Sequence, residues 1–141
     1  MIKKIKFGFF GLPLFLISVL LIVVVSSCKK TAGEGGKASI YGKVVTENYN
    51  NNFTVLNDVY ASADVDVYIV YGNETNYGDK QSTNYKGEFE FKYLRKGKYK
   101  IYVYSQDSSL TTASGDTVMI REVEIKEKKE KVNVGTITIF D

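Results

Sequence analysis

From Ala38 onward, apolar residues recur at every second position, and this alternation most constrains the fold. It is clearest in Ala63-x-Val65-x-Val67-x-Ile69, where aspartates occupy two of the intervening positions. A period of two places alternate side chains on opposite faces of a strand, so one face is predicted to be buried and the other wet. No stretch beyond residue 37 sustains the period of roughly 3.6 residues that an amphipathic helix needs. The sequence therefore predicts an all-β domain of short strands.

Turn signals separate the alternating segments. Asn84-Tyr85-Lys86-Gly87 and Arg95-Lys96-Gly97 each lie between two of them. Glycine adopts the positive φ that tight turns and bulges often need, so Gly87 and Gly97 are predicted to be structural turn residues. The Asn- and Tyr-rich segments 47–57 and 71–81 lack sustained alternation and are predicted to be loops.

The last third of the chain contains two breaks in the alternation. The segments 118–120 and 123–125 alternate in opposite phases, and a second slip falls at Gly135. If Lys126 pairs with Lys131 in a hairpin, the two slips lie opposite each other. Because a one-residue slip turns an apolar set toward water, this pattern predicts paired bulges or a shared bend.

The first 27 residues have the layout of a secretory signal. Three lysines precede the segment 7–25, which is almost wholly apolar. The chain's only cysteine follows it, in the cluster Val25-Ser26-Ser27-Cys28. This cluster resembles the lipobox of bacterial lipoproteins. The resemblance implies signal cleavage between Ser27 and Cys28, attachment of diacylglycerol to the Cys28 thiol, and acylation of the new amino group with a fatty acid such as palmitate.

Two other interpretations of this segment stay open. The 19 residues 7–25 come close to the ~20 that a membrane-spanning helix needs, although Pro13 and two glycines weaken a helix there. Alternatively, Cys28 is an ordinary buried or juxtamembrane thiol. Under the lipobox interpretation the acyl chains hold the protein on a membrane, because each buried CH₂ contributes about 0.8 kcal/mol.

These patterns predict that the chain has three parts. Residues 1–27 are predicted to be a lipoprotein signal peptide, 28–37 a flexible tether, and 38–141 one β-sandwich domain. The tether is predicted to be a coil because Lys29 to Lys37 is polar and rich in glycine. A coil of this composition reaches roughly 15–18 Å on average.

Composition argues against several functional classes. The chain has 19 basic and 16 acidic residues, and three lysines precede residue 28, so 19 − 3 = 16 basic residues face 16 acidic ones in the mature part. Nucleic-acid binding, which needs a basic excess, is not expected. There is no histidine, and Asp64 and Asp66, even with Asp58 and Asp107, supply too few converging oxygens for calcium, which takes about 6–8. No metal and no cofactor are expected.

The inward-facing pattern resembles the carboxypeptidase regulatory-like domain, a module similar to transthyretin and to the Cna-B repeats of surface adhesins. The segments that carry the resemblance are Ile40-x-Gly42-x-Val44, Ala63-x-Val65-x-Val67 and Gly87-x-Phe89-x-Phe91-x-x-Leu94-x-x-Gly97-x-Tyr99-x-Ile101-x-Val103. The resemblance is close from Ala38 to about Val103 and loose beyond. It implies a seven-stranded Greek-key β-sandwich.

The functional residues of the related proteins are not found in this chain. Carboxypeptidases and transthyretin-like hydrolases need histidines, and the hydrolases also need a Tyr-Arg-Gly-Ser ending. Cna-B repeats join a lysine to an asparagine under an acidic catalyst. Lys43 and Asn133 would be the partners here, but Val103 stands where that acid is required. We expect neither an enzyme nor an isopeptide bond.

Tyrosines supply the one candidate ligand face. Tyr68, Tyr102 and Tyr104 occupy outward positions, with Tyr41 expected nearby. Exposed aromatic rings can stack on a sugar, although tyrosine is also a favoured strand residue that pairs across a wet face without binding anything.

The sequence therefore predicts a lipid-anchored protein of the cell envelope with a non-catalytic sandwich that binds or assembles with a protein partner. A carbohydrate-binding surface lipoprotein acting through the tyrosines is the first alternative, and a structural subunit of a surface fibre is the second. Lys29 after Cys28 resembles the choice in enterobacterial lipoproteins that reach the outer membrane. The expected partners are a membrane, an envelope protein and, in the first alternative, a glycan.

Overall fold

The computed structural model describes residues 31–141, so the expected signal segment and the proposed cleavage and lipidation at Ser27 and Cys28 lie outside the described residues. No helix within residues 31–141 is long and apolar enough to cross a membrane. The strands of this part are β1 (Glu34–Tyr49), β2 (Leu56–Ala61), β3 (Asp66–Tyr71), β4 (Asp79–Ser82), β5 (Glu88–Leu94), β6 (Gly97–Gln106), β7 (Asp116–Ile125) and β8 (Lys131–Phe140).

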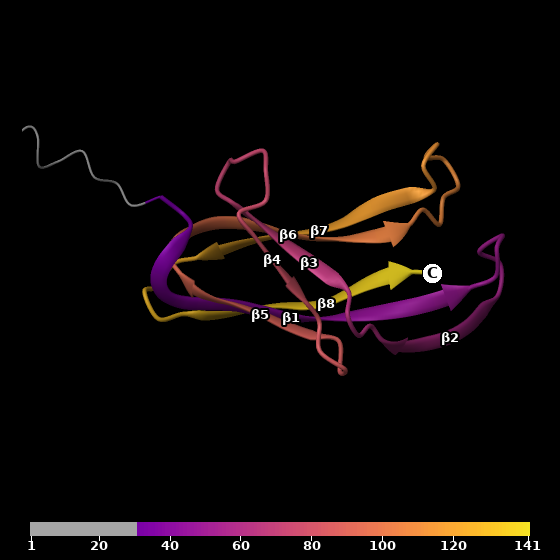
Figure 1. The fold of residues 1–141 in the computed structure, drawn as a ribbon, viewed down its shortest axis with the longest axis horizontal. Coiled ribbons are helices and arrows are strands. Elements are labelled where there is room, and N and C mark those ends of the chain that lie inside the picture. Colours follow the sequence, from indigo (N-terminus) through magenta and orange to yellow (C-terminus); the bar gives the residue numbers. More distant parts are fainter. Residues whose placement is uncertain (1–30) are drawn as a thin grey trace, which may run out of the picture. The chain divides into compact units, whose positions relative to one another are not determined.

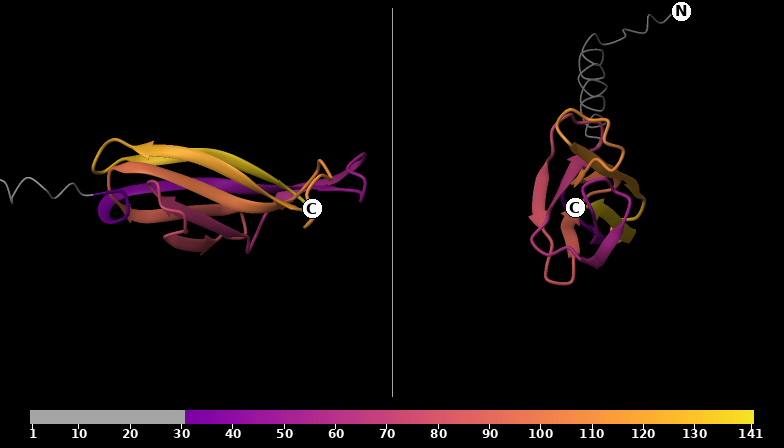
Figure 2. Two further views of the ribbon diagram at one scale, coloured as in Figure 1. Left: turned by 90° about the horizontal axis from the view of Figure 1, so that it is seen from above. Right: turned by 90° about the vertical axis from the view of Figure 1, so that its right-hand side faces the viewer.

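The strands form two sheets that pack face to face (Figure 1, Figure 2). In the first sheet the long strand β1 is central. Along one edge of β1, β5 pairs antiparallel with its first part and β2 pairs antiparallel with its last part. Along the other edge, β8 pairs parallel with β1. The second sheet is antiparallel, in the order β4-β3-β6-β7. The prediction of an all-β sandwich is confirmed.

The described part has eight strands where seven were predicted. The two predicted loops contain strand residues, because β1 continues to Tyr49, β2 begins at Leu56 and β4 spans Asp79–Ser82. The sequence of β4 has no apolar residue, and the strand is held by backbone pairing with β3. An edge strand needs no buried face, so hydrophobic alternation does not reveal it.

The core lies between the sheets and consists mostly of inward residues that alternation predicted, although Ala63, predicted to face inward, is exposed. The fully buried members are Ala38, Ile40 and Val44 from β1, Val67 and Ile69 from β3, Phe91 and Leu94 from β5, Tyr99, Ile101 and Val103 from β6, Ile125 from β7, and Ile137 from β8. β1, β3, β5 and β6, which supply most of this set, each contain a run of alternating buried and more exposed positions.

The domain begins earlier than predicted, because β1 starts at Glu34 inside the expected tether. The backbone N–H of Arg95 donates to the Gly33 carbonyl at 2.8 Å. The Tyr99 hydroxyl accepts from the Gly33 N–H at 3.0 Å and donates to the Arg95 carbonyl at 2.7 Å. Gly36 lies so close to the Leu94 backbone that a Cβ would overlap the Leu94 carbonyl. The glycines that suggested a flexible coil instead permit close backbone packing.

The predicted hairpin of the last third is wrong, because β7 and β8 belong to different sheets. β7 pairs with β6 in an unbroken register from Gly97 opposite Ile125 to Gln106 opposite Asp116, so β7 has no bulge. Val118 and Ile120 simply face outward and are exposed. The second slip is real: the pairing of β8 with β1 shifts between Tyr41 and Lys43.

Candidate binding face

The outward side of the second sheet carries a cluster of aromatic and aliphatic side chains. Tyr68 of β3 lies opposite Tyr102 of β6, and Tyr102 lies opposite Ile120 of β7. Tyr104 lies opposite Val118 in the same way. Residues directly opposite each other in antiparallel strands point to the same side of the sheet. We call the cluster the tyrosine face; its members are Tyr68, Tyr77, Tyr102, Tyr104, Val118 and Ile120.

The rings of the tyrosine face pack against one another. Tyr68 and Tyr102 stack nearly parallel, with centroids 4.9 Å apart and planes 8° apart. Tyr104 meets both rings edge-on, at 5.7 Å from Tyr68 and 5.8 Å from Tyr102. Tyr77, from the segment between β3 and β4, meets Tyr68 edge-on at 5.2 Å. Such contacts hold the rings in place before a ligand binds, so less conformational entropy is lost on binding.

Four members of the cluster remain well exposed to solvent. The exposed fractions are 54% for Tyr77, 55% for Tyr104, 40% for Val118 and 49% for Ile120. Tyr68 and Tyr102 lie half-buried beneath their neighbours. Burial, together with the neighbouring Tyr104 and Tyr68 hydroxyls, raises the pKa of Tyr102.

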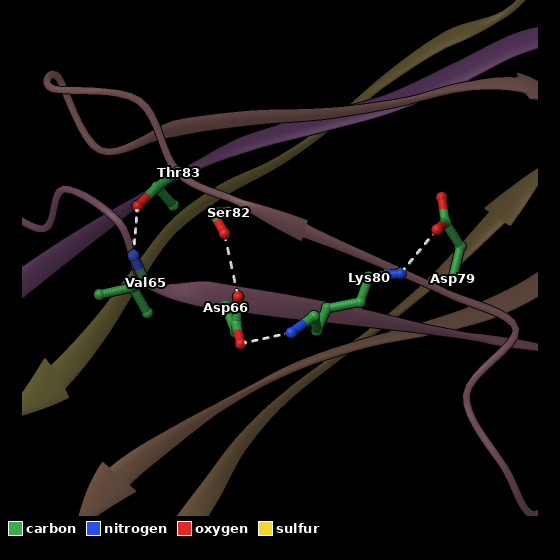
Figure 3. A network of polar contacts seen from close by, with 6 residues as sticks. All are labelled: Val65, Asp66, Asp79, Lys80, Ser82 and Thr83. Atoms are coloured by element: carbon green, nitrogen blue, oxygen red, sulfur yellow. Dashed lines mark hydrogen bonds and ion pairs between the residues drawn. The ribbon is translucent and has the colours of Figure 1, made fainter.

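An ion pair between β3 and β4 lies beside Tyr68 of the tyrosine face. Figure 3 shows the pair and its polar neighbours. The Lys80 ammonium lies 2.8 Å from an Asp66 carboxylate oxygen, and the Ser82 hydroxyl donates to the other oxygen at 3.0 Å. The bonds from Lys80 and then Ser82 lower the pKa of Asp66. Lys80 also lies 5.9 Å from the centre of the Tyr68 ring. The polar groups around this ion pair satisfy one another.

The loop 107–115 joins the two strands that carry most of the face, and Asp107 organises it. The Asp107 carboxylate accepts hydrogen bonds from the backbone N–H groups of Ser109 at 2.9 Å, Thr111 at 2.9 Å and Thr112 at 2.8 Å, and from the Ser109 hydroxyl. The Ser109 hydroxyl and the Thr112 N–H are the main groups that lower the pKa of Asp107. The ionised carboxylate therefore stabilises the loop more than the protonated acid does.

This arrangement predicts an acid-dependent loss of stability. A carboxyl whose pKa is lower in the folded state than in the unfolded state stabilises the fold above its unfolded pKa of about 3.9. That contribution is lost as the pH falls from about 5 through 2 and below. We expect Asp107→Asn to be less stable than the wild type at neutral pH, and the difference to shrink with acidification. Urea unfolding of both proteins across this range measures it, and a difference independent of pH would contradict it.

The structure separates Tyr41 from the other predicted tyrosines. Tyr41 is on β1 and faces outward from the first sheet, whereas Tyr68, Tyr102 and Tyr104 belong to the second. The expectation that Tyr41 lies near them is wrong. Alternation shows that a residue points outward from its sheet, but it does not show which sheet the strand joins.

The other residues singled out in the sequence occupy separate places. Gly87 and Gly97 have positive φ angles of 76° and 148°. Lys43 and Asn133 are both exposed, on the outward side of the first sheet. Within residues 31–141, no three aspartates or glutamates lie close enough together to hold a metal ion.

Sequence reasoning missed half of the tyrosine face. Tyr77 lies in a segment without alternation. Val118 and Ile120 alternate, but with the opposite phase of Val123 and Ile125 their pattern predicts an inward phase followed by a slip. A strand with one apolar pair facing outward and another facing inward has the same sequence pattern as a strand with a bulge between two inward pairs. The unbroken pairing of β7 with β6 shows that the first case holds here.

No family profile matches this chain, and no curated protein sequence matches it. Among solved structures, it is similar to a protein of Pseudomonas aeruginosa described as a candidate carbohydrate-binding protein, with a TM-score of 0.46, 12% identity, and coverage of 79% of this chain and 92% of the other. It is also similar to a 9R-lipoxygenase of Cyanothece, with a TM-score of 0.35, 14% identity, and coverage of 91% of this chain but 23% of the lipoxygenase. At these TM-scores neither likeness assigns a function or a site to this chain.

Proposed function

We propose that this chain is a lipid-anchored protein of the cell envelope whose β-sandwich is a non-catalytic binding module. The module contacts a protein partner through the tyrosine face. The observation that carries the proposal is the gathering of six apolar or aromatic side chains on the outward side of one sheet. Exposed apolar patches with a polar border are typical of protein interaction sites, where tyrosines often supply much of the binding energy.

The chemistry of the face favours a protein over a sugar. Tyr68 and Tyr102 stack on each other, so each ring already has a partner on one of its two faces. Val118 and Ile120 add exposed aliphatic surface beside them. Aliphatic side chains gain from contact with other apolar side chains but offer no hydrogen bond to a sugar hydroxyl.

Carbohydrate binding at the same face is the second candidate. It is favoured by the rings of Tyr77 and Tyr104, which are each more than half exposed. An exposed ring on a rigid sheet can stack against the apolar side of a sugar.

The anchor rests on the lipobox-like cluster that ends at Cys28. Two or three acyl chains on this residue would hold the module at a membrane surface, and the lysine at position 29 favours the outer membrane. Mass spectrometry of the protein from its native host is expected to find a mature chain that begins with an acylated Cys28. An unmodified Cys28 thiol would contradict the anchor.

The tyrosine face is tested by truncating two of its exposed or central rings. We expect Tyr102→Ala combined with Tyr104→Ala to reduce recovery of the partner at least tenfold when the full-length protein is crosslinked in membranes and purified. Two truncated aromatic anchors typically cost about 2–4 kcal/mol of binding free energy, and each 1.4 kcal/mol or so is a factor of ten. The same variants on a glycan array test the second candidate.

The matched control lies on the same side of the same sheet. Lys98 and Glu124 are exposed and directly opposite each other on β6 and β7, away from the rings. Lys98→Ala combined with Glu124→Ala is expected to leave recovery of the partner within twofold of the wild type. Equal recovery from the wild type and the tyrosine variant would refute the proposed protein interface.

A further inference from the structure

A depression of about 640 Å³ lies on the outward side of the first sheet, on the opposite layer from the tyrosine face. β1 runs through it, with β5 on one side and β8 on the other. Its lining includes six side chains that can stack on or hydrogen-bond to a ligand: Tyr41, Lys43, Glu88, Glu90, Lys131 and Asn133.

A β-bulge in β8 shapes one wall of the depression. The pairing partners of Tyr41 and Lys43 on β8 are Asn133 and Thr136, so β8 has one extra residue here. Gly135 has a φ of 76°, and its N–H donates to the Asn133 side-chain oxygen at 2.8 Å. Bulges commonly occur beside binding sites, where they bend a strand and re-aim its side chains.

β1, the strand that pairs with the bulged part of β8, has a glycine, Gly42, at the point of closest approach. A Cβ on Gly42 would lie 2.6 Å from Val134 Cγ2 and 2.9 Å from the Gly135 carbonyl oxygen. Both distances are far inside van der Waals contact, so only glycine fits at position 42. The bulge and Gly42 therefore act together, and the shape of the depression is built into the backbone.

Hydrogen-bonding side chains surround one aromatic ring in this depression. Tyr41, with an exposed fraction of 38%, lies directly between Glu90 on β5 and Asn133 on β8. Lys43, two residues further along β1, lies opposite Glu88. Adjacent strands are about 4.8 Å apart, so groups on three strands lie within reach of one ring-sized ligand on Tyr41.

Several of these polar groups are free to bind a ligand. Within residues 31–141, neither Lys43 nor Lys131 forms an ion pair. The Asn133 side-chain oxygen is committed to the bulge, and its amide nitrogen has no hydrogen bond to a described residue. Glu88 accepts from Asn84 at 3.1 Å through one carboxylate oxygen only.

The lining chemistry selects a class of ligand. Two lysines and two glutamates line the depression, so the lining itself has no excess formal charge of either sign, and the Glu90 carboxylate is already paired with the Lys92 ammonium at 3.3 Å. Both donors and acceptors line the depression beside an aromatic ring, and a sugar hydroxyl is both a donor and an acceptor. The apolar side of a pyranose can stack on the ring of Tyr41. We propose that this depression binds a neutral oligosaccharide.

The site is independent of the proposed protein interface, since the two lie on different sheets. The full-length protein in detergent is titrated with neutral hexasaccharides of glucose, mannose and xylose, and binding is followed by calorimetry. At least one is expected to bind with a Kd below about 1 mM, which corresponds to roughly −4 kcal/mol. Tyr41→Ala is expected to weaken that binding at least tenfold, and Tyr41→Phe, which keeps the ring, less than threefold.

The control is Tyr93→Ala, which removes an exposed tyrosine of β5 that does not line the depression. It is expected to bind as the wild type does. If Tyr41→Ala melts at a lower temperature than the wild type, Lys43→Ala replaces it and is expected to weaken binding at least threefold. Absence of binding to all three hexasaccharides, wild-type binding by the depression variants, or loss of binding in the Tyr102→Ala/Tyr104→Ala protein would each overturn the proposal.

Discussion

Replacing Gly87 by alanine is expected to lower the free energy of unfolding by about 3 kcal/mol or more. Gly87 has a φ of 76°, and a Cβ there would overlap the Val44 carbonyl oxygen. That oxygen accepts the Ser62 N–H at 3.1 Å, while the Val44 N–H donates to the Gly87 carbonyl at 2.8 Å. Through Val44, the central strand β1 is therefore bonded to Ser62, which follows β2, and to Gly87, which precedes β5. Moving the backbone away from the added Cβ would break these two hydrogen bonds.

A second glycine provides the matched control. Gly115 also has a φ of 76°, but a Cβ there would meet nothing within 4 Å. Gly115→Ala should therefore cost only the strain of a left-handed alanine, about 1–2 kcal/mol. The difference between the two variants in urea unfolding isolates the overlap with Val44. Equal losses at the two positions would show that the close approach of Gly87 to β1 is absent in solution.

Phe91→Ala is the second substitution with a large expected effect. Phe91 is almost fully buried, lies opposite Ile40 in the first sheet, and meets Phe89 edge-on at 6.0 Å. Removing a buried phenylalanine ring costs the transfer free energy of the ring and leaves a cavity between the sheets. We expect the free energy of unfolding to fall by about 3–5 kcal/mol.

The control for Phe91→Ala is an aromatic residue in the turn that precedes the same strand. Tyr85 is highly exposed, and its replacement by alanine is expected to change the free energy of unfolding by less than about 0.5 kcal/mol. Thermal or urea unfolding of the three proteins measures both effects. A loss of less than about 1 kcal/mol for Phe91→Ala would mean that the sheets do not pack around this ring.

Alternation predicted most of the residues that are inside, because burial of one face imposes a period of two on a strand. Ile40, Val67, Phe91 and Ile101 are all buried as their phase requires. The same signal fails for strands without a buried face, such as β4. It also gives no information about pairing, so β7 and β8 were expected to form a hairpin, whereas each pairs in a different sheet.

The tyrosine face was only partly predictable for the same reason. Tyr102 and Tyr104 share one strand and one phase, so their common orientation follows from the sequence alone. Tyr41 has an outward phase too, but its strand joins the other sheet. Ile120 belongs to the face only because β7 pairs with β6. Long-range pairing, which a local period does not encode, decides which outward residues become neighbours.

The most direct test of a protein partner at the tyrosine face is photo-crosslinking from single positions in living cells. A benzophenone amino acid is placed at position 104 or 120 of the full-length protein, and at position 98 on the same side of the sheet as a control. Adducts with one discrete protein are predicted from positions 104 and 120 and not from 98, and they should disappear when Tyr102→Ala is added. No protein adduct at 104 and 120, or the same adduct from all three positions, would contradict binding through this face.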